Sequence, residues 1–283
     1  MQCDAKNMNP NKLSIQYDNG ICTSINRELH RYHSADEYFF DSLKDNYLWF
    51  SNPENFNDPY DCNMDFDFEN TYEELETFFS EINNLPEYKS LKKSENDLKI
   101  QIAECVNNPE LLGKRYRDQR MIEVEKIGVC CFSESDQKLL MWSHYADKHK
   151  GVCLSFDINE DIQLFSSHPY AVEYPPRYPT INAIRERGLF KLRHFAFATK
   201  SLEWFYEQEV RIIRDDRFPP YRGKVEFNKK ALKTIKFGYK SSIADRLKTV
   251  NILYTAGDYQ HVRFYLAKLK KLDFGIEYEE IFN

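Results

Sequence analysis

The sequence has few glycines, no Cys-x-x-Cys spacing and no long apolar run, and each shortage argues against a class of protein. Only 9 of its 283 residues are glycine, so glycine-rich phosphate-binding loops are not expected. The 7 cysteines are odd in number, which argues against a disulfide scaffold and predicts reduced thiols in a cytoplasmic protein. No run approaches the roughly 18 apolar residues of a membrane span, and no signal-peptide pattern opens the chain. We therefore expect no membrane partner.

The residues that are present suit a globular protein with an aromatic-rich core. Hydrophobic residues make up 42%, aromatic residues 15% and charged residues 30% of the chain. The net charge of −6 is unevenly spread. The segment 177–248 holds 18 Lys and Arg against 8 Asp and Glu, a net charge of +10, so the remainder carries −16. A basic segment of this kind can hold the phosphates of a dinucleotide or a nucleic acid, or it can be an ordinary solvated surface.

Hydrophobic periodicity predicts a mixture of strands and helices without regular alternation. We expect strands at 28–33, 47–51, 127–133, 151–157, 171–174, 204–213, 225–227 and 234–238. We expect helices after the capping residues 34–37, two or three within 70–125, and others at 137–149, about 181–200, 245–252 (with a strand at 250–254 as the alternative) and 261–269. This order predicts an α+β fold with a mixed, mainly antiparallel sheet. Residues 1–25 are predicted to be a polar leader, and 26–283 a single domain with a helical insertion at about 65–125.

The segment 204–213 carries the most informative charge pattern. If it is one strand, Glu207, Glu209 and Arg211 share a face, and apolar side chains point the other way. Two neighbouring carboxylates raise each other's pKa, and an adjacent arginine lowers both. Such groups occur in active sites and also as plain cross-strand salt bridges, and the spacing leaves both interpretations open.

Several strings occur in one order and together carry a family resemblance. They are Phe56-Asn57-Asp58-Pro59-Tyr60-Asp61, Cys131-Phe132-Ser133-Glu134, Leu140-Met141-Trp142-Ser143-His144-Tyr145-Ala146, 151–157, Lys200-Ser201 and 204–211. Over roughly residues 28–240 the chain resembles the bacterial family catalogued as domain of unknown function 2971. That family name implies no activity.

A second resemblance concerns fold and chemistry. The chain is similar in outline to ADP-ribosyltransferases: Arg31 or His33 on a first strand, Ser133 with Tyr145 further on, and a late Glu-x-Glu at 207–209. It lacks the His-Gly-Thr or Arg-Gly signature after the first strand and the Ser-Thr-Ser string. The resemblance implies an ADP-ribosyltransferase-like fold, NAD as substrate, no metal, and a nucleic-acid or protein acceptor. It also implies a toxin or antiphage role.

This resemblance implies roles for named residues. A carboxylate near the ribose stabilises the oxocarbenium-like centre formed when nicotinamide leaves, and a second carboxylate orients or deprotonates the acceptor. Glu209 is favoured for the ribose and Glu207 for the acceptor, although the sequence does not rank them firmly. Arg31 would hold the pyrophosphate. Tyr145 or Trp142 would stack on nicotinamide, unless both serve core packing.

The remaining candidates each have a structural alternative. His144 lies off the apolar stripe of its helix, as a site residue or as a surface histidine. Asn57 and Asp58 either line the cleft or form a turn with Pro59. Lys200 is either a phosphate-binding cation or a solvated lysine. The full set comprises catalytic Glu209, Glu207, His144 and Tyr145, and cofactor-binding Arg31, Tyr32, Ser133, Trp142, Asn57, Asp58, Lys200 and Arg211. The cleft is predicted between the first strand, the helix at 142–149 and the strand at 207–211.

Two other classes of function remain open. A metal-dependent nuclease would gather carboxylates around Mg²⁺; its candidates are Asp58, Asp61, Glu207 and Glu209, with Lys200. A non-catalytic sensor would bind a nucleotide in the same cleft without turnover. Zinc is disfavoured because His and Cys do not cluster at ligand spacing. Serine hydrolase chemistry is disfavoured because no Gly-x-Ser-x-Gly string occurs.

Overall fold

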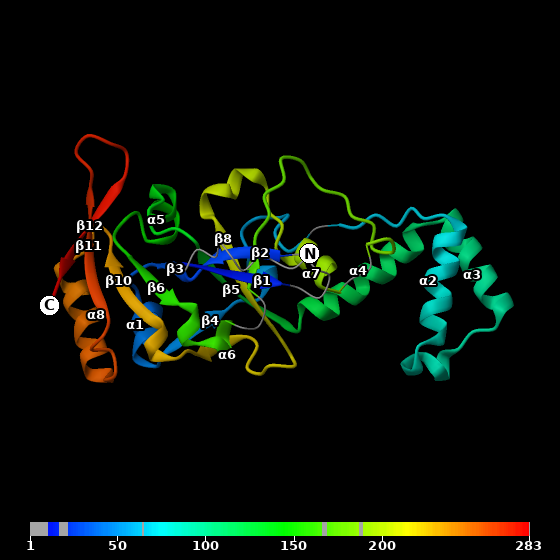
Figure 1. Cartoon of the computed structure of the whole chain (residues 1–283), viewed down its shortest axis with the longest axis horizontal. Helices are drawn as coiled ribbons and strands as arrows, with labels where there is room; N and C mark the ends of the chain where they lie inside the picture. The colour runs from blue at the N-terminus through cyan, green and yellow to red at the C-terminus, as the bar shows by residue number, and fades with distance from the viewer. Residues whose placement is uncertain (1–10, 17–21, 64, 166–168, 187–188, 283) are drawn as a thin grey trace.

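The computed structural model describes residues 11–16, 22–63, 65–165, 169–186 and 189–282, and an eight-stranded sheet forms the centre of this part of the chain (Figure 1). The strand order is β12-β11-β10-β6-β3-β5-β8-β7. Neighbouring strands are antiparallel, except that β10 and β11 are parallel. The predicted α+β class with a mixed, mainly antiparallel sheet is therefore confirmed.

The boundaries of the elements are as follows. The central sheet contains β3 (Glu28–His33), β5 (Ile127–Ser133), β6 (Val152–Asp157), β7 (Tyr170–Ala171), β8 (Glu209–Asp215), β10 (Leu232–Phe237), β11 (Arg263–Leu269) and β12 (Ile276–Ile281). Two separate pairs are β1 (Lys12–Gln16) with β2 (Cys22–Asn26), and β4 (Tyr47–Phe50) with β9 (Gly223–Glu226). The α-helices are α1 (Glu37–Lys44), α2 (Tyr72–Asn84), α3 (Glu95–Asn107), α4 (Glu110–Val124), α5 (Leu139–Tyr145), α6 (Ile162–Phe165), α7 (Leu189–Phe197) and α8 (Ile243–Ala256). None of the described helices is both long and apolar enough to cross a bilayer.

One face of the sheet is apolar and carries the main core. Side chains such as Leu29, Leu154 and Ile212 pack there in one buried cluster with Phe39 of α1 and Leu253 of α8. Burial of this apolar surface is the main favourable term for the fold. Figure 1 shows α1 and α8 together on one side of the sheet and α5 on the other.

The opposite face of the sheet is polar along one transverse row. Glu209 pairs with Ser133, Ser133 with His30, and His30 with Ser155, so that four neighbouring strands contribute one polar side chain each. All four residues are buried. Directly paired residues share a face of an antiparallel sheet, so this row places buried polar groups side by side beneath α5.

The sheet opens between β3 and β5. Both strands are fully described, and His30 with Ser133 is the one residue pair that joins them. Past that point the Arg31 guanidinium occupies the gap and donates to the carbonyl oxygens of Cys131 and Trp49, both at 3.3 Å. The arginine thus links β3 to a carbonyl group of β5 and to one of β4.

The segment predicted as a helical insertion contains α2, α3 and α4. Thr71 caps α2 with Glu74 in a capping box, as the Thr-x-x-Glu spacing favours. Figure 1 shows α2 and α3 side by side, far from the sheet, with α4 leading back to it. Leu75 and Ile102 are buried between these helices. Within the predicted leader 1–25, β1 and β2 pair with each other, and 1–10 and 17–21 lie outside the described residues.

The predicted strand at 204–213 is wrong in its first half. Residues Leu202–Glu207 form a 3-10 helix, η5, because Ser201 caps it by accepting a hydrogen bond from the Glu203 amide. Gln208 then takes a left-handed conformation (φ 45°) before β8 begins. Strand alternation therefore does not relate Glu207 to Glu209.

Other boundaries also differ from the prediction. The helix predicted at 137–149 is shorter, because residues 147–149 have positive φ and turn the chain after α5. The helix predicted at 261–269 is strand β11, since pairing with β10 and β12 outweighs local helical spacing. The helix predicted at 245–252 is confirmed as α8, and the alternative strand at 250–254 is wrong.

Candidate functional site

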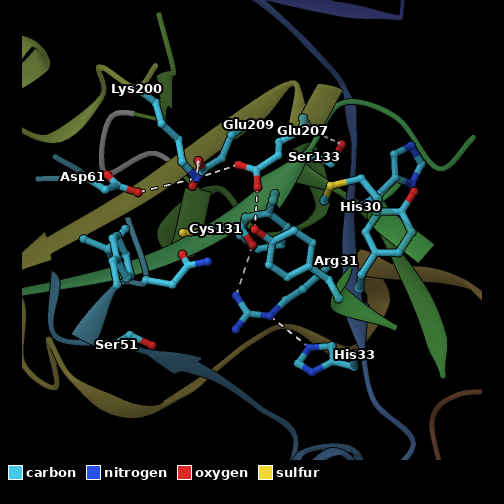
Figure 2. Close-up of a pocket in the computed structure, with 17 residues that line it drawn as sticks. His30, Arg31, His33, Ser51, Asp61, Cys131, Ser133, Lys200, Glu207 and Glu209 are labelled. Atoms are coloured by element: carbon cyan, nitrogen blue, oxygen red, sulfur yellow. Dashed lines mark hydrogen bonds and ion pairs between the residues drawn. The ribbon is translucent and has the colours of Figure 1, made fainter. Parts of the chain in front are cut away.

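A cavity of about 330 Å³ lies where β3 and β5 separate (Figure 2). Its walls come from β3, β5, α5, the loop after β4, and the junction of η5 with β8. The lining residues are His30, Arg31, Tyr32, His33, Ser51, Phe56, Asn57, Asp61, Val129, Cys131, Phe132, Ser133, Met141, Tyr145, Lys200, Glu207 and Glu209. Segments far apart in the sequence thus meet around one opening in the sheet.

A turn in the loop after β4 brings Asp61 into this wall. The Asp58 Oδ1 atom accepts a hydrogen bond from the Tyr60 amide at 2.9 Å, and the Asp61 amide donates to the Asp58 carbonyl at 3.1 Å. This is the Asx-turn chemistry that the Asn-Asp-Pro string predicts. The turn places the Asp61 carboxylate beside Arg211 of β8.

Arg211 binds two carboxylates in paired contacts. Its Nε and Nη2 atoms donate to Glu209 at 2.8 and 2.9 Å, and its Nη1 and Nη2 atoms donate to Asp61 at 2.7 and 2.8 Å. Nη1 also donates to the Phe197 carbonyl at 2.8 Å. The side chain is fully buried. Such double contacts fix both carboxylates in orientation as well as in position.

Lys200 links three carboxylates. Its Nζ atom donates to Glu207 Oε2 at 2.7 Å and lies 3.5 Å from both Asp61 Oδ2 and Glu209 Oε2. The ammonium also lies 4.6 Å from the centre of the Trp204 ring. Burial opposes the charged form of this lysine, but Glu209, Glu207 and Asp61 together raise its pKa above the ordinary value. Lys200 therefore stays charged.

The pKa values of the two glutamates are shifted in opposite directions. Burial raises the pKa of Glu207, which Lys200 opposes and Glu209 reinforces. Burial acts in the same direction on Glu209, but the Arg211 guanidinium outweighs it and, with Lys200, lowers the pKa of Glu209 to about 2. Glu209 is thus a fixed anion, and of the two glutamates Glu207 is the one whose raised pKa favours exchange of a proton.

Tyr145 of α5 completes the surroundings of Glu207. Its hydroxyl donates to Glu207 Oε1 at 2.5 Å, opposite the Lys200 contact. Burial and then the Glu207 contact raise the pKa of Tyr145 well above its ordinary value, so the hydroxyl stays protonated. Figure 2 shows Glu207 and Glu209 on one side of the cavity and Arg31 on the other.

Eight predicted site residues therefore line one cavity: Glu207, Glu209, Tyr145, Arg31, Tyr32, Ser133, Asn57 and Lys200. Two of them have hydroxyl groups that serve the backbone. The Ser133 hydroxyl donates to the Glu207 carbonyl at 2.6 Å, and the Tyr32 hydroxyl donates to the Ser135 carbonyl at 2.9 Å. These two residues shape the wall more than they offer free polar atoms.

Four predicted residues lie elsewhere. Trp142 is fully buried, with its ring against Tyr32 and its Nε1 atom donating to the Asp136 carbonyl. His144 is exposed, and its Nδ1 atom lies 3.0 Å from the Tyr206 hydroxyl. Arg211 lies behind Glu209, and Asp58 lines a neighbouring cavity. Of Tyr145 and Trp142, the two residues predicted to stack on a ligand, Tyr145 alone lines the cavity.

Several lining residues were not predicted for the favoured activity. Asp61 was assigned only to the nuclease alternative, although it stands in the same string as Asp58. His30 was not predicted either, although it lies on the same strand as Arg31 and His33, which were offered as alternatives for the first-strand position. Burial lowers the pKa of His30 to about 4 and that of His33 to about 3. Tyr174 does not line the cavity, but its hydroxyl accepts a hydrogen bond from the Glu209 amide at 2.8 Å, and it carried no sequence signal.

The arrangement suits charge stabilisation with proton transfer. A fixed anion and a proton-exchanging carboxylate share one cavity wall, which is a pattern that general acid–base sites use. The position that a cation bridging Asp61, Glu207 and Glu209 would take is filled by the Lys200 ammonium. Across the described residues, no three His, Cys, Asp or Glu side chains are grouped as metal ligands.

Comparison with known proteins bears on the segment that holds most of this cluster. No curated protein and no solved structure matches the chain. The family model described as Protein of unknown function (DUF2971) matches residues 141–212, which include Tyr145, Lys200, Glu207, Glu209 and Arg211. The predicted family is thus supported over residues 141–212, where the chain matches the DUF2971 model.

Proposed function

We propose that the cavity binds NAD, breaks its nicotinamide–ribose bond and transfers ADP-ribose to a macromolecular acceptor. The observation that carries this proposal is the pair Glu207 and Glu209, which lie on one cavity wall with opposite pKa shifts and face Arg31 across the opening. An ADP-ribosyltransferase-like arrangement of the first strand and the Glu-x-Glu segment agrees with this proposal. A cytoplasmic location, which the odd number of cysteines favours, is part of this proposal.

The chemistry needs a negative charge at the ribose and a place for one proton. When the glycosidic C–N bond breaks, its electron pair leaves with nicotinamide, and positive charge develops on the ribose carbon. The acceptor then forms the new bond to that carbon and loses a proton. Ionised Glu207 supplies the charge in the first step and takes the proton in the second, which its raised pKa favours.

This assignment gives Glu207 the direct role and Glu209 a supporting one. Both oxygens of Glu209 are held by Arg211, whereas those of Glu207 accept from the side-chain ends of Tyr145 and Lys200. Those two donors can turn toward a ligand more readily than a buried guanidinium. Glu209 would keep Lys200 charged and in place beside Glu207.

The cavity wall offers groups for the rest of NAD. A volume of about 330 Å³ lies at the lower end of the range for small-molecule sites, so we place the nicotinamide-ribose half inside. Of the five N–H groups of Arg31, four point to His33, Cys130, Cys131 and Trp49. One N–H on Nη2 is left for the pyrophosphate.

The nuclease alternative is less well supported. A divalent metal would have to displace the Lys200 ammonium from between Asp61, Glu207 and Glu209, and Arg211 already compensates two of these carboxylates. The displaced Lys200 ammonium would lose its buried partners, and breaking a buried ion pair is costly. The sensor alternative differs from the transferase in turnover alone, and the experiment below separates the two.

The test is incubation of the protein with NAD, radiolabelled in the adenylate phosphate, and cell lysate. We expect nicotinamide release and label on a macromolecule, which nuclease and protease digestion then classify. Glu207→Gln should lower the rate by about a hundredfold or more, whereas Glu203→Gln on the exposed side of η5 should not. NAD binding without nicotinamide release would favour the sensor, and Mg²⁺-dependent cutting of nucleic acid would favour the nuclease.

A further inference from the structure

A second cavity, of about 590 Å³, adjoins the first. The two share Phe56 and Asp61 as a common wall. The second cavity lies between the loop after β4 and helix α4, which contributes Arg117 and Met121. None of its lining residues belongs to the part of the chain that matches the family model. It therefore needs an explanation separate from the Glu207 cluster.

Asp58 in this cavity has an unused hydrogen-bond acceptor. Its side chain is buried, at 7% exposed, and lines the second cavity. Its Oδ1 atom accepts from the Tyr60 amide, but its Oδ2 atom has no hydrogen-bond partner. A buried carboxylate oxygen without a donor is costly to maintain. A ligand that donates to Oδ2 would remove that cost.

The charges around Asp58 indicate the sign of the ligand. Glu54, Asp58 and Asp65 line the cavity, and the cation there, Arg117, already contacts Asp65 at 3.6 Å and pairs with Glu110. Asp61 is compensated by Arg211 on the other side of the wall. The surplus is negative, so the cavity attracts a cation and repels phosphate.

The remaining walls indicate the size and kind of cation. Pro53, Pro59, Met121 and Val124 give the cavity apolar surface, which suits the alkyl stem of a long cationic side chain. The described acidic residues here are not grouped as metal ligands. A bare metal ion would also leave most of a 590 Å³ cavity unfilled.

We propose that this cavity binds the positively charged side chain of a protein partner. Resting on the proposed function, we further infer that this partner is the acceptor of ADP-ribose, which selects protein over nucleic acid. The shared wall of Phe56 and Asp61 holds the bound side chain next to Lys200 and Glu207. Cation recognition and transfer would thus occur on two sides of one wall.

The experiment is a calorimetric titration of the full chain without NAD, so that it does not depend on turnover. The probes are Nα-acetyl-arginine amide, Nα-acetyl-lysine amide and, as the neutral match to arginine, Nα-acetyl-citrulline amide. We expect saturable binding of at least one cationic probe and, since a charge-assisted hydrogen bond is lost, binding of citrulline that is weaker by about tenfold or more. Equal binding of the citrulline probe would overturn the proposal.

Substitutions test whether Asp58 contacts the bound cation. Asp58→Asn keeps an oxygen for the Tyr60 amide, so it should fold as well as the wild type and weaken the cationic probe by about tenfold. Asp45→Asn, at an exposed carboxylate that pairs with Lys224 and does not line this cavity, should leave the affinity unchanged. Met121→Arg on the exposed side of α4 should also weaken binding, by adding positive charge.

The outcomes separate this proposal from the proposed function. Unchanged affinity in both Asp58→Asn and Met121→Arg would overturn the site, whatever NAD does in the first cavity. Binding of Ca²⁺ or of a single-stranded oligonucleotide, with no binding of either cationic probe, would also overturn it. Cationic probe binding in a protein that releases no nicotinamide would overturn the acceptor role and support the site.

Discussion

Two buried charge clusters lie on the same face of the sheet, and their difference shows what sets a candidate site apart. The Glu207 cluster consists of Asp61, Lys200, Glu207, Glu209 and Arg211. The Lys236 cluster consists of His30, Asp136, Ser155 and Lys236. In the latter, Lys236 Nζ lies 2.6 Å from Asp136 Oδ2 and donates to Ser155 Oγ at 3.0 Å, and Ser155 Oγ lies 2.9 Å from His30 Nδ1.

The clusters differ in charge balance. Inside the protein, the Lys236 cluster balances one cation with the Asp136 carboxylate, and the half-exposed Glu28 carboxylate lies 3.8 Å from Lys236 Nζ. Burial and then Lys236 lower the pKa of His30 to about 4 and keep it neutral. The Glu207 cluster has three carboxylates and two cations. Burial of charge is therefore common to both. The surplus carboxylate beside a cavity is the feature that indicates chemistry.

The largest expected effect comes from removing the central cation of the Glu207 cluster. Arg211→Met leaves Glu209 and Asp61 buried without compensation, so the free energy of unfolding should fall by about 3–5 kcal/mol. Denaturant unfolding measures this, with Arg263→Met at an exposed position as the control. A loss no larger than that of the control would show that the cluster does not behave as an interdependent unit.

The matching change in the Lys236 cluster should be smaller. Lys236→Met removes a contact with Asp136, which is less deeply buried than Glu209, so we expect a loss of about 1–3 kcal/mol in the free energy of unfolding. The rate of nicotinamide release should stay unchanged, because Lys236 does not line the cavity. If Lys236→Met lowers the rate of nicotinamide release as much as Glu207→Gln does, the two clusters do not differ in function as proposed.

The pH dependence of stability should also separate the two glutamates. The pKa of Glu207 is raised above 4.5 in the folded state. Protonated Glu207 therefore contributes to the free energy of unfolding below pH 4.5, and this contribution is lost as the pH rises past the folded pKa. The pKa of Glu209 is lowered, so its contribution is present above 4.5 and is lost as the pH falls toward about 2. Glu207→Gln should therefore be at least as stable as the wild type at pH 7, with the difference shrinking below pH 4.5. Urea unfolding across this range measures it, and a variant that is clearly less stable at pH 7 would show that ionised Glu207 is structural.

The smallest expected effect belongs to Tyr145→Phe. Loss of the hydroxyl that donates to Glu207 Oε1 should raise the pKa of Glu207 further, by about one unit or less. The acid limb of the rate of nicotinamide release should move to higher pH by the same amount. Tyr206→Phe, which removes a hydroxyl that contacts His144, is the control. If the acid limb of the rate does not move, Tyr145 does not affect the pKa of Glu207.

The sequence predicted the fold class and most of the elements that carry the site, because local periodicity and capping determine them. The strand 127–133 and the helix that follows the capping residues 34–37 are of this kind. It failed where distant pairing decides, as in β11, whose neighbours β10 and β12 fix its conformation. The left-handed conformation of Gln208 was also missed. Ser201 was not identified as the cap of η5, so the predicted strand included residues 204–207, which are helical.

The same limit explains the site. The Glu-Gln-Glu string drew attention to two residues that do line the cavity, although not through the strand alternation first assumed. Arg211 was expected to bind a ligand, but its partner Asp61 lies 150 positions away in sequence. No local sequence pattern shows that Arg211 is paired with a carboxylate of the protein and not with a ligand. The sequence pattern at Asp58 likewise predicts a turn residue. Only the structure shows that its Oδ2 atom has no hydrogen-bond partner.

The central claim, that Glu207 faces a bound ribose, is tested most directly by a crystal structure of the protein with ADP-ribose. We predict the ribose inside the 330 Å³ cavity, within hydrogen-bond distance of the Glu207 carboxylate, and the pyrophosphate beside Arg31. ADP-ribose bound outside this cavity, or with its ribose turned away from Glu207, would contradict that prediction.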